Sequence, residues 1–559
     1  MRNEEIRRLH TLSQRILWSL VWFVAINYFI AIGTSWNRGI SFAWIGFFGV
    51  LASVTGMLLP WVQSSSPPPW YTHTSAAVVT AMAFWHGWLN IANITRERSD
   101  ASALNDFAVK LWSHGVDPYT ASMTGATSTL GSPAAMWTYT LNGGHVSTFS
   151  YPAGALTFET PLRWLGVTHL TGSWFNLGAW ILTCLLAYWL LPHSLRAVAI
   201  LAVFLGGSMA LGGTSTDAAW MPFLLLAVYQ WDRFAETVRP WFYRYLGPAA
   251  LGVACSFKIT PWFVVPFILV GIFLETRRRF DRPFDAVLRY LAVVVGSFLV
   301  VNLPFIVLSP MSWLRGAILP VTSGLIPGGQ GLVSLVIHGD LPGVRTTPMS
   351  LAGLVVVAMA ILAFARWYPT LKAGFLFFIP ALFFIPERSY ATYFESFFLV
   401  AVVAGATVAA SDERIGAAWR REWRIGALVT PGVAVVGLLA YSLFVPVLSS
   451  SVAGTTIKDG LWSGLTLDIT NHSAHVVTAH VLVSVDDFHG GGFWLTPTGD
   501  TITLAANTTT VVALTPPVPT ARPSVHQAWV AQVMTASPGW LGTTTPHYGL
   551  SSITAPTAG

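Results

Sequence analysis

The sequence predicts an α-helical membrane protein that crosses the bilayer about thirteen times and ends in a β-sandwich domain. Three observations predict this fold. Of the 559 residues, 53% are hydrophobic and only 10% are charged, and the mean hydropathy is +0.59, which is typical of multi-pass membrane proteins. Apolar runs follow one another from residue 16 to residue 447. Beyond residue 450 they give way to short alternating segments separated by Gly, Pro and Asn.

Each apolar run is long enough, or nearly so, to cross the hydrocarbon core of a bilayer as a helix. The runs on either side of Phe257 and Lys258 are short, so they form either two half-spanning helices or one broken helix. The first run has no small-residue cleavage motif and is interpreted as a retained helix. We expect the helices at 16–35, 41–60, 75–95, 173–191, 196–213, 218–231, 245–257, 260–275, 287–308, 350–365, 373–386, 390–410 and 425–447.

Basic residues set the expected orientation in a cell membrane. Arginine is concentrated in the N-terminal tail and in the connections around 277–279 and 414–424, and short basic segments favour the cytoplasmic side. This puts the N-terminus in the cytoplasm and three long segments outside, at 96–172, 309–349 and 448–559. The connection 61–74 has no Lys or Arg and does not support the scheme. Cytoplasmic loops account for the net charge of +6, so the charge indicates membrane lipids and no nucleic acid as partners.

The chain is expected to divide into a membrane domain, 1–450, and an extracytoplasmic β-sandwich, 451–559. The alternating segments 465–470, 476–485, 501–504, 510–514 and 528–533 predict its strands. One interpretation is a cap that stabilises the membrane domain. The other is a carbohydrate-binding module whose tryptophan rings stack on sugars, although a small sandwich also needs aromatic core residues. The rings concerned belong to Trp462, Trp494, Trp529 and Trp540.

The loop after the third apolar run holds two candidate acids, Asp100 and Asp106. The apolar positions 104, 107, 108 and 111 predict an amphipathic helix that ends near Gly115. Acids at the mouth of a membrane bundle are costly to place there, which makes them candidate functional residues. Asp100 stands where the helix begins, so it is either a general base or, with Ser99, a helix cap. Asp106 is the competing base and faces a different direction.

Several segments carry, in their order, a resemblance to a known family. They read Gly-Val-Asp-Pro-Tyr at 115–119, Tyr-Pro-Ala-Gly at 151–154, Gly-Gly-Thr-Ser-Thr-Asp at 212–217, Ala-Cys-Ser-Phe-Lys-Ile-Thr-Pro at 254–261, Gly-Gly-Gln-Gly-Leu-Val-Ser-Leu at 328–335 and Pro-Glu-Arg-Ser-Tyr at 386–390. Over residues 75–410 this order resembles GT-C glycosyltransferases, most closely the branch with the actinobacterial phosphatidylinositol-mannoside mannosyltransferases and some arabinofuranosyltransferases. The catalytic acid of that branch precedes its Pro-Tyr pair at a distance that Asp100 fits better than Asp106.

The resemblance implies an enzyme that moves mannose or arabinofuranose from a polyprenyl-phosphate donor to a glycolipid or cell-envelope glycan on the outer face. Asp100 would be the catalytic base, with Asp106 as the alternative, and Lys258 and Arg388 would hold the donor phosphate. The competing interpretation is that these two cations form structural ion pairs with Asp217, Glu387 or Glu395. The residues expected to bind substrate are Tyr119, Asp217, Gln330, His338, Glu387 and Tyr390.

No cofactor is implied, and the sequence has no HExxH, CxxC or tight acidic cluster that predicts a metal site. A different class of function stays open: a membrane transporter or lipid flippase whose polar residues line an outward cavity. Transporters more often show related halves and ionisable groups near the bilayer midplane. Here the polar residues gather at one face and the outer loops are long, which favours an enzyme. A transferase of the same class acting on protein or oligosaccharide is a third interpretation.

Overall fold

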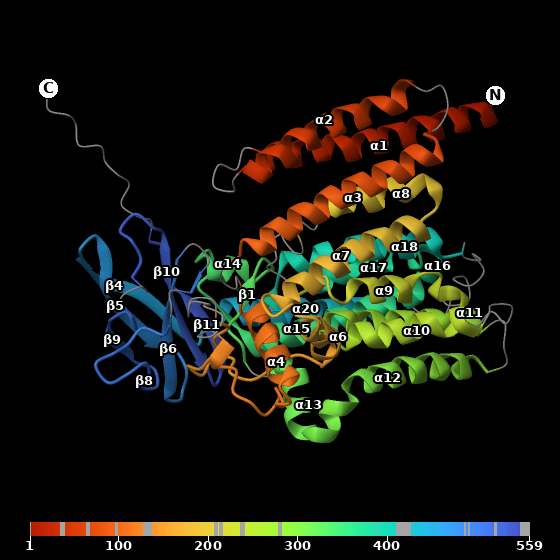
Figure 1. Ribbon diagram of the computed structural model, residues 1–559. Helices are drawn as coiled ribbons and strands as arrows, with labels where there is room; N and C mark the ends of the chain where they lie inside the picture. The colour runs from red at the N-terminus through yellow and green to blue at the C-terminus, as the bar shows by residue number, and fades with distance from the viewer. Residues whose placement is uncertain are drawn as a thin grey trace, which may run out of the picture.

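The computed structural model is mostly helical and ends in antiparallel β-sheets (Figure 1). The strands gather at one end of the helical bundle, and α1 and α2 contact each other along one edge of it. The structure describes residues 2–33, 40–62, 67–94, 99–126, 137–205, 211, 216–234, 241–277, 282–322, 324–386, 388–409, 426–485, 488–489, 492–518 and 522–547.

Each apolar run of the sequence contains a helix over at least part of its described residues. The helices that correspond to the runs are α1 (Arg2–Gly33), α2 (Ile40–Val62), α3 (Pro69–Ala92), α7 (Thr171–Leu190), α8 (Arg196–Leu205), α9 (Met221–Val228), α10 (Trp241–Cys255), α11 (Val264–Thr276), α12 (Pro283–Leu308), α15 (Thr346–Arg366), α17 (Phe375–Leu382), α18 (Ala391–Thr407) and α20 (Gly426–Phe444). Between them lie α4 (Asp100–Ser113), α6 (Gly154–Trp164), α13 (Pro310–Thr322), α14 (Ser334–Ile337), α16 (Tyr368–Leu371) and the 3-10 turns η3 (His193–Leu195), η5 (Trp231–Arg233) and η6 (Thr260–Phe263).

The prediction of about thirteen membrane spans is wrong. Among the described residues, four helices are long and apolar enough to cross a membrane: Trp44–Val62, α7, α12 and α15. A spanning helix needs about 20 residues, because each residue adds only about 1.5 Å to a crossing of about 30 Å. Many runs form shorter helices, such as α8 with 10 residues and α9 and α17 with 8 each. The runs around Lys258 form two helices, α10 of 15 and α11 of 13 residues, joined by a turn.

The C-terminal strands form two antiparallel sheets that share one buried core. One sheet orders β4 (Leu448–Lys458), β5 (Leu461–Asn471) and β9 (Thr509–Leu514). The other orders β2 (Gly343–Arg345), β11 (Gly539–Thr543), β10 (Trp529–Ala536), β6 (Val477–Val485) and β7 (Phe488–His489), and β8 (Ile502–Leu504) pairs with β6. Alternate residues of β5, from Leu465 to Asn471, are buried, as period-2 strands require. The shared core takes Leu467 and Val512 from one sheet and Val481 and Trp540 from the other.

Strand β2 joins the helical part to the sheets. It leaves the loop after α14 and pairs antiparallel with β11, placing Gly343 opposite Gly542. A Cβ on Gly343 would collide with the ring of Trp540, so the backbone reaches this edge only without a side chain. The guanidinium of Arg345 donates to the carbonyl of Val445 at 2.7 Å. The loops that carry the candidate residues therefore lie at the strand-bearing end of the bundle (Figure 1).

Candidate functional site

The acidic loop begins with a capped helix, and the cap is Ser99. Its hydroxyl accepts a hydrogen bond from the N–H of Ser102 at 3.2 Å, which satisfies one of the open donors of the first turn of α4. The neighbouring Asp100 is half-buried, and its carboxylate accepts a hydrogen bond from the hydroxyl of Thr138. Of the two residues that could cap α4, Ser99 does so. The Asp100 side chain instead accepts from Thr138, which lies further along the same connection between α3 and α6.

Asp106 lies in a different place from Asp100. Its carboxylate is buried and accepts a hydrogen bond of 2.7 Å from the N–H of Gly172, in the first turn of α7. The carboxylate of Glu159 is beside it, because a Cβ on Gly172 would be 3.0 Å from Asp106 and 3.1 Å from Glu159. A carboxylate at this position is stabilised by the helix dipole and satisfies an open N–H group. The geometry gives Asp106 a structural task at the start of α7.

The loop at 151–154 is fixed against the turn that carries Lys258. The N–H of Gly154 donates to the carbonyl of Ser256 at 2.7 Å. Asn302 of α12, which is fully buried, accepts from the N–H of Ala153 at 2.8 Å and donates to the Ser256 hydroxyl at 3.1 Å. A Cβ on Gly154 would be 2.7 Å from the Ser256 carbonyl oxygen, so the approach requires glycine. Tyr151 is thereby held next to the Lys258 turn.

Lys258 forms an ion pair with Asp217. The ammonium nitrogen is 2.6 Å from a carboxylate oxygen, and the side chains are 12% and 5% exposed. The same nitrogen lies 5.5 Å from the centre of the Tyr151 ring. Burial by itself lowers the pKa of Lys258, but the charge of Asp217 outweighs it and holds the pKa above the usual value. Lys258 is therefore charged at neutral pH. Its ammonium group has three N–H donors, and the contacts with Asp217 and the Tyr151 ring do not use all of them.

Arg388 is positioned by a short parallel pairing. Strand β1 (Gly328–Gly329) lies along β3 (Arg388–Ser389), with Gly328 opposite Arg388. The left-handed φ of +105° at Gly329 and the closeness of the Ser389 carbonyl, which a Cβ would overlap, both require glycine here. The Gln330 side chain closes the pairing by accepting from the N–H of Ala391 at 2.7 Å. The guanidinium of Arg388 then donates to the Tyr390 hydroxyl at 2.6 Å.

These segments bring charged groups together around the Tyr151 ring. Burial raises the pKa of the Tyr151 phenol, the charges of Lys258 and Arg388 lower it, and those of Asp100 and Asp217 raise it. Burial lowers the pKa of Arg388, while Tyr390 and Asp100 act on it in the opposite direction and leave it raised. Such interactions require short separations. We call Asp100, Tyr151, Asp217, Lys258, Arg388 and Tyr390 the polar cluster.

Other expected substrate-binding residues have different positions. Tyr119 is buried, and its hydroxyl donates to the backbone carbonyl of Tyr151 at 2.7 Å. It therefore holds the backbone of a cluster residue in place. Gln330 is exposed but uses its amide oxygen on the backbone, as described above. His338 caps α14 with its ring 2.7 Å from the Ser334 carbonyl, beside the C-terminal strands. Glu387 lies outside the described residues.

Several residues of the site had no role assigned to them from the sequence, although Tyr151 and Ser256 stand in the motifs 151–154 and 254–261. Thr138 holds Asp100, Tyr151 stands at the centre of the cluster, and Asn302 and Ser256 fix its loop. Asn302 carried a detectable signal, because an amide within the apolar run 287–308 is costly unless it is hydrogen-bonded. Thr138 carried none, and the motif that contains Ser256 did not reveal its role, since both roles depend on contacts between distant segments.

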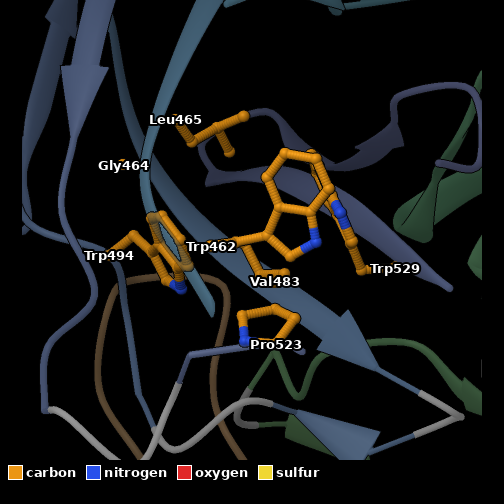
Figure 2. Close-up of a pocket in the computed structure, with 7 residues that line it drawn as sticks. All are labelled: Trp462, Gly464, Leu465, Val483, Trp494, Pro523 and Trp529. Carbon is orange, nitrogen blue, oxygen red and sulfur yellow. The ribbon is translucent and has the colours of Figure 1, made fainter. Parts of the chain in front are cut away.

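The tryptophans of the C-terminal sheets surround a small cavity. Figure 2 shows Trp462, Trp494 and Trp529 around it, with Pro523 at its edge. Its volume is about 10 Å³, which is room for about one water molecule and not for a sugar ring. The fourth ring, Trp540, is fully buried in the core. In this conformation Trp494, Trp529 and Trp540 belong to the core of the sheets, and Trp462 packs against it.

A second ion network lies away from the polar cluster, at the other end of α11. The ammonium of Lys372 is 2.6 Å from Glu275 and 2.9 Å from Asp232. Tyr368 donates to Glu275 at 2.9 Å, and the N–H of Ala409 donates to Asp232 at 3.0 Å. All three charged side chains are less than 10% exposed. This network joins η5, the end of α11, α16 and the segment that follows α18.

No family model, curated protein or solved structure matches this chain. Within the part of the chain that the structure describes, no group of three or more His, Cys, Asp or Glu side chains is arranged to hold a metal ion. The polar cluster therefore has to be interpreted from its own chemistry, which combines a half-buried carboxylate that accepts from a hydroxyl, an ion pair whose carboxylate is buried, and a half-buried arginine.

Proposed function

We propose that this protein is a membrane glycosyltransferase of the GT-C type that uses a polyprenyl-phosphate sugar. The observation that supports the proposal is that one carboxylate, Asp100, and two cations, Lys258 and Arg388, all act on the Tyr151 phenol, with the Lys258 ammonium 5.5 Å from the centre of its ring. Mannose or arabinofuranose is the proposed sugar, and a glycolipid or cell-envelope glycan on the outer face is the proposed acceptor. Both follow from the resemblance in the sequence.

The proposed reaction needs a base for the acceptor. The hydroxyl oxygen of the acceptor bonds to the anomeric carbon of the donor sugar, and its proton passes to the Asp100 carboxylate. The bond between that carbon and the phosphate oxygen breaks, and polyprenyl phosphate leaves with the electron pair. Asp100 suits the base role because Thr138 orients it with a single hydrogen bond and Ser99, rather than Asp100, caps α4. Asp106 is the weaker candidate, since it caps α7.

The leaving phosphate needs positive charge. Lys258 has three donors and gives one hydrogen bond to Asp217, while Arg388 has five and gives one to Tyr390. Their remaining N–H groups support binding of a phosphate, and arginine can do so with two parallel hydrogen bonds. Preorganised cations in a place shielded from water lower the barrier because no solvent has to reorganise.

The test uses the purified full-length protein in detergent with polyprenyl-phosphate mannose, arabinose and glucose as donors and an extracted membrane-lipid fraction as acceptor. We expect transfer from at least one donor. Asp100→Asn should lower the rate by at least about 100-fold, the usual contribution of a general base, and leave the unfolding temperature unchanged. Asp106→Asn is the matched variant, and it should keep activity because an asparagine oxygen can still cap α7.

Three outcomes contradict the proposal. Full activity in Asp100→Asn with loss in Asp106→Asn would move the base to Asp106. Activity that survives loss of both Lys258 and Arg388 would remove the phosphate role. Transfer from none of the donors, together with substrate flux in liposomes, would favour the transporter or flippase.

A further inference from the structure

A second cavity lies at the end of the bundle away from the strands (Figure 1). It is enclosed by the last turn of α9, the first half of α10 and the second turn of α12, and its volume is about 40 Å³. This is room for a group of a few heavy atoms. The side chains with polar groups that line it belong to Tyr229, Gln230, Trp231, Arg244 and Tyr290, and the remaining wall is apolar. None of the polar cluster lines this cavity.

Two buried donors at this cavity have no hydrogen-bond partner among the described residues. They are the hydroxyl of Tyr290, which is 1% exposed, and the indole N–H of Trp231, which is 3% exposed. Burying such groups unpaired is costly, so a partner is expected. Neither ring can turn away. The ring of Phe234 packs edge-on against Tyr290 at 5.0 Å, and Trp231 fills a gap that exists because residue 271 is glycine.

The lining selects for a ligand that accepts hydrogen bonds. Trp231 can only donate, Arg244 carries a positive charge, and among the described residues no Asp or Glu lines the cavity. Asp232, which follows Trp231 in the sequence, accepts instead from Lys372 at 2.9 Å and from the N–H of Ala409 at 3.0 Å. Arginine next to neutral donors is the usual chemistry of a phosphate site.

The position indicates where such a phosphate comes from. α12 is a candidate span of 26 residues, and Tyr290 is its eighth residue. It is therefore about 10 Å from the start of a helix about 39 Å long, close to the level of lipid headgroups and glycerol. Tyr and Trp side chains are enriched at that level. The apolar wall, with Leu226, Phe234 and Leu246, suits the first carbons of an acyl chain.

We propose that this cavity binds the phosphate of an anionic membrane lipid, held by Arg244, Tyr290 and Trp231, on the face opposite the polar cluster. The site is separate from the proposed transfer reaction and does not depend on it. Its ligand chemistry is a phosphate attached to apolar chains. Free phosphate has the charged group but not the apolar chains, so an experiment can distinguish it from a lipid headgroup.

The test adds three probes separately to delipidated full-length protein in detergent: dioleoylphosphatidylglycerol, dioleoylglycerol, and inorganic phosphate. Native mass spectrometry counts the retained lipid, and thermal unfolding reports stabilisation. We expect retention and a higher unfolding temperature with dioleoylphosphatidylglycerol alone. Tyr290→Phe and Arg244→Gln should each weaken lipid retention by about tenfold, since each removes a hydrogen bond to a charged group. Tyr290→Phe removes one oxygen that has no partner within the described residues, so it should fold normally.

The matched control is Arg289→Gln. Arg289 is exposed, lies next to Tyr290 on α12 and does not line the cavity, so its loss should leave retention unchanged. Equal retention by Tyr290→Phe and the wild type would overturn the proposal. Equal binding of dioleoylglycerol would refute phosphate recognition, and stabilisation by inorganic phosphate to the same degree as by the lipid would refute the lipid as its source.

Discussion

The ion pair of Lys258 and Asp217 allows structure and function to be separated by one double-mutant cycle. The 2.6 Å contact joins side chains that are 12% and 5% exposed, so solvent screens it little. Lys258→Met leaves a buried carboxylate without its counter-ion, which should cost about 3 kcal/mol of unfolding free energy. Asp217→Asn should cost a similar amount. The double variant carries neither charge and should be more stable than either single variant. The unfolding free energies lost by the two single variants should therefore add up to about 3 kcal/mol more than the free energy lost by the double variant.

Activity should behave differently from stability in this cycle. If the ammonium of Lys258 holds the donor phosphate, the double variant regains stability but stays inactive. The assays are chemical unfolding in detergent and sugar transfer, measured on the same preparations. A double variant that recovers transfer together with stability would show that Lys258 serves only to balance Asp217. A double variant that loses as much stability as both single variants combined would refute the coupling itself.

The pH dependence of the pair has a definite sign. Burial lowers the pKa of Lys258, but Asp217 holds it above its ordinary value of 10.5. A lysine whose pKa is higher in the folded state adds stability below its unfolded pKa, and this contribution is lost as the pH rises through the folded value. The stability difference between the wild type and Lys258→Met should therefore stay constant from about pH 6 to about pH 9 and shrink only above about pH 10.5. A decrease below about pH 9 would contradict this.

Three further predictions concern how the cluster is positioned. Gly154→Ala puts a methyl group 2.7 Å from a backbone oxygen and should cost about 1–3 kcal/mol and most of the activity. Gly178→Ala, in the open part of α7, should instead stabilise by about 0.5–1 kcal/mol in the same unfolding assay. Gly329→Ala should abolish transfer by displacing Arg388, whereas Gly324→Ala, whose Cβ meets nothing within 4 Å, should be strained only by its φ of +55°; equal transfer by both would contradict the positioning role of β1. Asp106→Ala should cost about 1 kcal/mol through the lost cap of α7, and Asp106→Asn almost nothing, as thermal unfolding can measure.

Helix positions could be predicted from the sequence because long apolar runs favour helices, whose backbone hydrogen bonds lie within the segment. The number of spans could not, because hydropathy counts apolar residues and not the length of the helix they form. α17 shows the difference: its run has fourteen residues at 373–386, but the helix covers only Phe375–Leu382. The alternating pattern after residue 450 predicted strands, yet β2 was invisible, since three residues at Gly343–Arg345 become a strand only when β11 lies beside them.

The candidate site was also only partly predictable from the sequence. Residue type identified Asp100, Lys258 and Arg388, since charge in an apolar chain is rare and costly. The sequence does not show which of these charged side chains form hydrogen bonds or ion pairs with other parts of the protein. Asp106 and Asp100 are six positions apart in one helix, but only the first accepts from the N–H of Gly172.

The two lysines at opposite ends of the bundle show how such a distinction can be made. Lys372 is 3% exposed and meets two carboxylates, so its charge is more than balanced and water hardly reaches it. Lys258 is 12% exposed and meets one carboxylate. A ligand anion approaching Lys372 would have to displace an acid from a closed network, which costs more than it returns. At Lys258 the same anion can use donors that the protein has not occupied, with Arg388 acting through the same phenol. Burial and charge alone would favour Lys372 as an anion site, whereas accessible donors favour Lys258 as the residue that would hold the proposed donor phosphate.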